Sequence, residues 1–142
     1  MDERAAWNEQ RRRAIDEHAA ALAAGRETEA RQAADLLTSF VQRAAEGGLP
    51  PHRLTARSFD GRATYRTKAR GWYLKSNRSI AVGEHGEYYV LTVPSSWRAR
   101  FTGADLSPSI PKLIVGAGGG DGETIPLAQL LDQRLDAGAT WP

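Results

Sequence analysis

The sequence predicts an α+β fold with an N-terminal antiparallel helical hairpin, a small, mostly antiparallel β-sheet and a C-terminal helix packed on the sheet. Three observations support this prediction. Residues 2–46 lack proline and repeat their apolar residues at helical spacing. Residues 51–101 contain short alternating segments bounded by turn residues, which is typical of strands. Residues 126–138 return to helical spacing between a proline and a glycine.

The N-terminal region is predicted to form two helices. In the first, Trp7, Ile15 and Leu22 fall within about 80° of one another on a helical wheel. Gly25 is predicted to end this helix and start the turn of the hairpin. One continuous helix is the alternative, because a single interior glycine costs only about 1 kcal/mol. The second helix is predicted over residues 27–46, and its apolar face comprises Ala30, Ala33, Leu37, Phe40, Val41 and Ala44.

The first helix has a thin apolar stripe that is filled mostly by alanine. Alanine lets helices approach closely but buries little area, so this helix needs something to pack against. We therefore expect residues 1–48 to form an arm that docks on the rest of the chain, on another protein or on a second copy of the chain. The predicted interface residues are Trp7, Ile15, Leu22, Leu37, Phe40 and Val41.

Turn signals divide the middle of the chain into strands. Asp60-Gly61 is the strongest hairpin signal, and it separates residues 53–59 from residues 62–69. A second turn is predicted at residues 83–86, before a strand over residues 87–93. Both faces of that strand are largely apolar, which favours a central position in the sheet.

The C-terminal part is predicted to complete a compact domain over residues 51–142. A short buried strand is expected at residues 113–115 and is followed by the glycine-rich residues 116–122. These glycines do not spell a phosphate-binding loop, because Asp121 stands where GxGxxG needs its third glycine, and a flexible loop is the preferred interpretation. The last helix is expected to begin near Pro126, and its apolar face comprises Leu127, Leu130, Leu131 and Leu135.

Charge is distributed unevenly along the 142 residues. The net charge is only +2, but residues 51–101 contain ten Lys or Arg residues and three Asp or Glu residues. The segments on either side are mildly acidic. This asymmetry favours an anionic partner for the middle of the chain. The alternative is that the three segments neutralise one another within the fold.

The Asp60-Gly61 hairpin predicts where these cations gather. A two-residue loop leads to the cross-strand pairs Phe59–Arg62, Arg57–Thr64, Thr55–Arg66 and Arg53–Lys68. One face of the hairpin would then carry Arg53, Arg57, Arg62, Arg66, Lys68 and Arg70, with Phe59 at its tip. Like charges directly opposite one another destabilise a sheet by up to about 1 kcal/mol, so such a face suits an anionic partner.

Nucleic acid is the commonest partner of this kind. Phe59, Trp72 and Tyr73 are predicted to stack on bases if the strand is single, and a β-ribbon in the major groove is an alternative for a duplex. Two interpretations without nucleic acid remain open. The cations could protect an exposed sheet edge from aggregation, or acidic residues of the helices could cover them.

Nothing in the sequence spells a catalytic, metal or cofactor site. The chain has no Cys, and His18, His52 and His85 lack metal-ligand spacing. We therefore expect a non-enzymatic protein that binds no metal or cofactor. The opening Met-Asp-Glu-Arg has no apolar signal segment, and no apolar run approaches the roughly 20 residues of a membrane span, so we expect a cytoplasmic protein without a membrane partner.

Two functional hypotheses follow from different features of the sequence. The first is a binding protein whose basic hairpin face contacts nucleic acid or another polyanion. The second is a protein-interaction or assembly subunit that acts through its Ala-rich N-terminal helices, in which case the cations of the hairpin are spectators.

Overall fold

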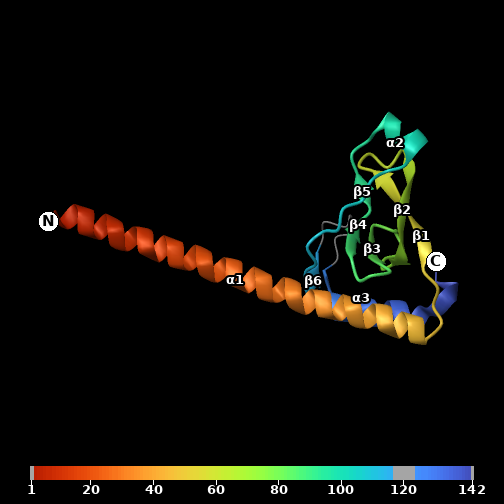
Figure 1. Cartoon of the computed structure of the whole chain (residues 1–142), viewed down its shortest axis with the longest axis horizontal. Coiled ribbons are helices and arrows are strands. Elements are labelled where there is room, and N and C mark those ends of the chain that lie inside the picture. Colours follow the sequence, from red (N-terminus) through yellow and green to blue (C-terminus); the bar gives the residue numbers. More distant parts are fainter. Residues whose placement is uncertain (1, 117–123, 142) are drawn as a thin grey trace.

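The computed structural model describes residues 2–116 and 124–141 and confirms the α+β class (Figure 1). A long helix lies at the N-terminus, a curved five-stranded sheet follows, and a shorter helix lies at the C-terminal end. The elements in chain order are α1 (Glu3–Glu46), β1 (His52–Ser58), β2 (Thr64–Tyr73), β3 (Ile80–Gly83), β4 (Tyr88–Val90), β5 (Thr92–Val93), α2 (Trp97–Thr102), β6 (Ile114–Val115), β7 (Ile125–Pro126), α3 (Leu127–Ala137) and the 3₁₀ turn η2 (Gly138–Thr140).

The predicted helical hairpin is wrong, because α1 is one continuous helix of 44 residues. The Asp2 carboxylate caps its start by accepting a hydrogen bond from the Arg4 N–H at 3.2 Å. Gly25 lies within the helix, and a Cβ placed there would meet no other atom within 4 Å. A cost of about 1 kcal/mol is not enough to break a helix in which the residues on both sides favour helix.

The two halves of α1 have different surroundings. Ala33, Leu37, Phe40 and Ala44 are fully buried at 4-3-4 spacing against α3 and the sheet. Residues 3–28 run away from the rest of the molecule as a free helix, and at 1.5 Å per residue they extend about 39 Å (Figure 1). We call residues 3–28 the arm. The packed part of α1 begins near Glu29, whose carboxylate accepts a hydrogen bond from the Leu113 N–H at 3.1 Å.

The five-stranded sheet has the order β4-β3-β2-β1-β5 and closes through a single extended segment. Residues 88–90 of this segment pair with β3, and residues 92–93 pair in parallel with β1. Leu91, between them, donates its N–H to the Ser79 carbonyl and accepts from the Arg57 N–H, both at 2.8 Å. Residues 88–93, which were predicted to form a central strand, therefore supply both outer strands of the sheet, β4 and β5. The sheet curls so that its two ends meet in this segment.

This closure explains why residues 88–93 are apolar on both faces. Tyr88 faces the larger core, where α1 and α3 cover β3 with Ile80 and Val82. Tyr89 and Leu91 face a smaller cluster inside the curve of the sheet with Leu54 and Ala81. Helix α2 lies at the end of the sheet away from α1 (Figure 1).

None of the described helices combines the length and apolarity that a membrane span requires.

The C-terminal helix is confirmed as α3. Its predicted apolar residues Leu127, Leu130 and Leu131 are buried, and Gly138 ends it with φ of 66°. The predicted strand at residues 113–115 corresponds to β6, which pairs with β7. Gly116 is the last described residue before the glycine-rich loop, and the rest of that predicted loop lies outside the described residues.

Candidate functional site

The β1–β2 hairpin is ordered at its tip by a network around Asp60. The Asp60 carboxylate accepts hydrogen bonds from the Ser58 hydroxyl at 2.6 Å and from the Arg62 N–H at 2.9 Å. Gly61 takes φ of 73°, which favours glycine. The hydrogen bond from Ser58, followed by that from Arg62, holds the pKa of Asp60 below its usual value. The predicted turn at Asp60-Gly61 is therefore confirmed, but the predicted two-residue loop with Phe59 opposite Arg62 is wrong, because the Gly61 N–H donates to the Ser58 carbonyl at 2.9 Å and puts Phe59 and Asp60 at the centre of the turn.

The predicted register is confirmed near the turn and wrong further along. Arg57 faces Thr64 and Thr55 faces Arg66, as predicted, but Arg53 faces Arg70 instead of Lys68. Between these pairs β2 advances four residues while β1 advances two, which is a bulge in β2. β2 therefore has two extra residues at the bulge, and because two is an even number, its side chains beyond the bulge return to the same face.

Side chains satisfy the backbone groups that the bulge leaves without ladder partners. The Thr67 hydroxyl donates to the Leu54 carbonyl at 2.6 Å, and the Thr55 N–H donates to the Tyr73 hydroxyl at 3.0 Å. Such local satisfaction is what allows a bulge to persist in a sheet interior. The composition of the two strands alone does not reveal it.

Five of the six predicted cations are exposed at alternating positions on one face of β1 and β2, and the sixth, Arg62, is exposed in the connection between the two strands. The residues that alternate with these cations along β1 and β2, including Leu54, Ala56 and Tyr65, are buried. None of the six cations forms an ion pair with another described residue. The helices therefore do not cover or neutralise this surface. We call it the basic face, and its exposed members are Arg53, Arg57, Arg62, Arg66, Lys68 and Arg70.

Of the three aromatic residues predicted to stack on bases, only Phe59 is exposed. Phe59 is 68% exposed at the hairpin tip. Trp72 lies in the helix–sheet core, where its indole N–H donates to the Leu49 carbonyl at 3.1 Å and its ring meets Phe40 edge to face. Trp72 is thus removed from the predicted surface. Tyr73 is half-buried, and its ring lies under the Arg78 guanidinium at 5.3 Å.

Sequence analysis missed the helix that supplies exposed aromatic residues beside the basic face. The short helix α2 begins after Ser96, whose hydroxyl accepts from the Ala99 N–H at 3.3 Å. Trp97 and Phe101 lie one turn apart on it, 76% and 75% exposed, with ring centroids 6.1 Å apart. The serine cap followed by aromatic residues at i,i+4 spacing is the signal that could have found this helix.

Two hydrogen bonds hold α2 and the segment after it against β2. The Ser96 N–H donates to the Tyr65 hydroxyl at 3.0 Å, and the Ala104 N–H donates to the Arg66 carbonyl at 2.8 Å. Gly103 allows the second contact, because a Cβ there would lie 2.7 Å from the Arg66 carbonyl oxygen. The aromatic helix is therefore attached to β2, which carries three of the six cations.

Two hollows lie beside α2, and each combines one exposed aromatic ring with cations. One, of about 180 Å³, is lined by Phe101 together with Arg53, Arg66, Lys68 and the carboxylate of Asp105. The other, of about 380 Å³, is lined by Trp97 together with Arg62, Arg100, Tyr65 and the carboxylate of Asp60. Cations outnumber carboxylates in both hollows, so both suit an anionic ligand that also has an apolar face.

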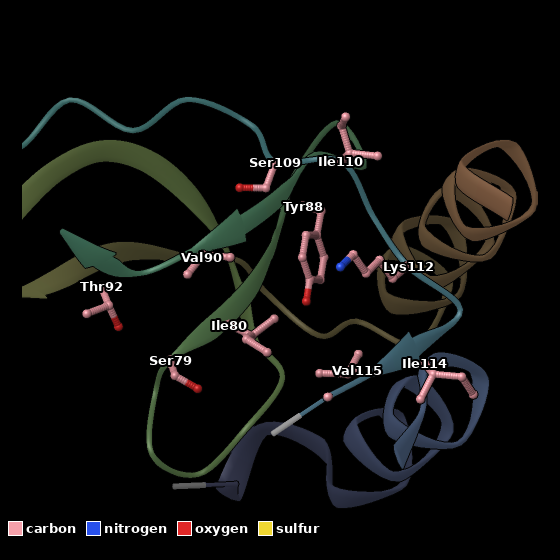
Figure 2. Close-up of a pocket in the computed structure, with 11 residues that line it drawn as sticks. Ser79, Ile80, Tyr88, Val90, Thr92, Ser109, Ile110, Lys112, Ile114 and Val115 are labelled. Carbon is pink, nitrogen blue, oxygen red and sulfur yellow. The ribbon is translucent and has the colours of Figure 1, made fainter. Parts of the chain in front are cut away.

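A third hollow, of about 370 Å³, has a different character (Figure 2). Its lining is mostly aliphatic and aromatic, with Ile80, Tyr88 and Ile114 among its members. Burial raises the pKa of the Tyr88 hydroxyl. Lys112 is the one cationic side chain in the lining, so this hollow suits an apolar group and the basic face is the better site for a polyanion.

The predicted protein interface divides into two sets. Trp7, Ile15 and Leu22 are exposed on the arm at 51–59%. Leu37 and Phe40 are buried in the core of their own chain, and Val41 packs against the same core. The prediction that these last three face a partner protein is therefore wrong, because α3 and the sheet already occupy that side of α1.

The histidines that lacked metal-ligand spacing in the sequence lie apart on the surface. His18, His52 and His85 are all exposed, and no three His, Asp or Glu side chains of the described chain gather as metal ligands would. No known protein-family model, curated protein or solved structure matches this chain. Its function must therefore be argued from the surfaces themselves.

Proposed function

We propose that this protein binds nucleic acid through the basic face, without catalysing a reaction, and that it does so in the cytoplasm. The observation that supports this proposal is that one hairpin carries six exposed cations, five of them on the same face of β1 and β2, and that none has an ion-pair partner among the described residues. A phosphate backbone supplies regularly spaced negative charge, and its neutralisation releases condensed counterions.

The alternative explanation, a charged edge that prevents aggregation, fits the structure less well. The cations stand on a face of the paired strands β1 and β2 and not along a strand edge, and β5 also pairs with β1 at Arg57 and Ser58. The cations lie on the outer surface of paired strands, where threonine or glutamate would serve solubility equally well. Repulsion between Arg53 and Arg70 is a cost that a polyanion would remove.

Binding of labelled oligonucleotides across a salt series tests this proposal. If all six cations meet phosphates, the log–log slope of affinity against salt should be about −4 on a single strand and about −5 on a duplex. The double variant Arg57→Glu, Arg66→Glu should abolish binding and leave the far-UV circular dichroism spectrum unchanged. Its matched control is Arg12→Glu, Arg26→Glu, which changes the net charge equally on the exposed arm.

The comparison between these two variants decides the site. Loss of binding only in the hairpin variant supports the basic face. Equal loss in both variants would indicate that net charge alone, and not this surface, drives binding. Wild-type protein that binds no oligonucleotide even at low salt would refute the proposal.

The exposed arm favours a second candidate function, association with another protein. Residues 3–28 make no contact with the sheet or α3, yet they carry Trp7, Ile15 and Leu22 exposed on one side. Tertiary packing supplies most of the stability of helices in proteins, and the arm has none, so a partner would stabilise it. A second copy of the chain is the first partner to test.

Light scattering after size-exclusion chromatography measures this self-association. The wild type should elute as a dimer or larger assembly, and Trp7→Glu, Leu22→Glu should convert it to a folded monomer. A wild type that is monomeric at high micromolar concentration would exclude self-association through the arm.

A further inference from the structure

We infer that the nucleic acid is single-stranded and that its bases stack on Trp97 and Phe101. This inference rests on the proposed function, because the cations of the basic face supply the phosphate contacts. It adds a second surface, which we call the aromatic helix face: the exposed rings of Trp97 and Phe101 on α2.

Exposure of these two rings is the first observation. A six-residue helix that leaves both of its aromatic side chains about three-quarters exposed gains little from burying them. Only Ala99 of α2 is buried, so the helix is held mainly by its hydrogen bonds to β2. Large rings exposed together beside cations are what single-strand-binding surfaces use to stack bases.

The arrangement of the rings is the second observation. Their planes are 78° apart, and Phe101 and Trp97 line separate hollows, each with cations from β2 or its neighbours. One base therefore cannot lie between the two rings, but two bases of one strand can each use a different ring. Arg66 and Lys68 in one hollow and Arg62 and Arg100 in the other are then placed to meet the phosphates.

Only a single strand offers this combination. In a duplex both faces of each base are covered by its stacked neighbours, and unstacking costs a few kcal/mol per step. A single strand exposes base faces and phosphates together, and stacking on an aromatic side chain contributes about 1–3 kcal/mol per base, with little dependence on sequence.

The test compares three probes of equal length: an oligothymidine strand, a duplex, and an abasic strand that keeps the phosphates but lacks bases. The double variant Trp97→Ala, Phe101→Ala should bind oligothymidine at least tenfold more weakly than the wild type and bind the abasic strand equally well. Trp7→Ala, which removes an exposed ring from the arm, is the matched control and should bind all three as the wild type does. The single variant Trp97→Tyr should keep most of the wild-type affinity for oligothymidine, because it keeps an aromatic ring at this position.

The outcomes separate this inference from the proposed function. If duplex and single strand bind equally and the alanine variant matches the wild type, the inference is overturned while the proposed function stands. If the alanine variant loses the abasic strand as well, α2 positions the cations and does not stack, which also overturns the inference. If the wild type binds none of the three probes, both fail.

Discussion

Arg53 and Arg70 lie directly opposite one another across the β1–β2 hairpin, and both side chains are exposed. A bulge in β2 creates this pair by shifting the register past Lys68. Neither residue has a carboxylate partner in the described parts of the chain, although Arg70 also donates weakly to the Pro51 carbonyl at 3.4 Å. Two like charges in this position cost stability, and the polyanion of the proposed function would relieve that cost.

Neutralising one member of this pair should stabilise the free protein and weaken binding. Arg53→Gln should raise the free energy of unfolding by up to about 1 kcal/mol, because it removes the repulsion from Arg70. Arg57→Gln is the control, since Arg57 faces the neutral Thr64 and should show no such gain. Urea unfolding gives the stabilities, and a stability gain that is equal in both variants would contradict the repulsion.

Removing the indole ring of Trp72 and removing that of Trp97 should have very different effects on the free energy of unfolding. Trp72→Ala should lower the free energy of unfolding by about 3–5 kcal/mol, because it leaves a cavity beside Phe40 in the core. Trp97→Ala should change it by no more than about 0.5 kcal/mol, because that ring is mostly in solvent. Chemical denaturation measures both, and a large loss for Trp97→Ala would show that α2 contributes to the core.

Protonation of Asp60 should loosen the hairpin tip. Its pKa is lower in the folded than in the unfolded chain, so its contribution to stability is complete above the unfolded pKa and is lost as the pH falls through the folded pKa. Ser58→Ala removes the strongest cause and should raise the pKa of Asp60 toward its usual value. An NMR titration of the Asp60 carboxyl carbon measures this shift, and an unchanged pKa in Ser58→Ala would contradict the assigned cause.

The Tyr65 hydroxyl should control how firmly α2 is attached. Tyr65→Phe leaves the Ser96 N–H without its acceptor, at an expected cost of about 0.5–1.5 kcal/mol. Hydrogen exchange should become faster in residues 96–102 and stay unchanged in β3. Under the stacking inference, affinity for oligothymidine should fall while affinity for the abasic strand does not. Unchanged exchange at residues 96–102 would show that the hydrogen bond from Ala104 to Arg66 is sufficient.

The features that sequence analysis predicted correctly depend on neighbouring residues. Asp60-Gly61 forms its turn because the Asp60 side chain bonds within the loop and Gly61 tolerates positive φ. The register of the first pairs after the turn follows from that loop. The alternation along β1 and β2 then assigns cations to one face and Leu54, Ala56 and Tyr65 to the other.

The features that it predicted wrongly depend on distant contacts. Gly25 alone does not end α1, and the helix continues because nothing packs against it there to bend it. Trp72 lies on the same face of β2 as Lys68 and Arg70. It is nevertheless buried, because α1 covers the sheet at that end of β2. Helix α2 has only six residues, too few for periodicity to reveal.

The sequence by itself determined the α+β class, the hairpin at Asp60-Gly61 and the cationic character of its outer face, because turn chemistry and alternation act over a few residues. Only the tertiary structure decided that α1 covers one end of the sheet, that residues 88–93 close it, and that α2 lies beside the cations. These are contacts between residues far apart in the chain, and their free energy comes from burial and hydrogen bonds that exist only once the chain has folded.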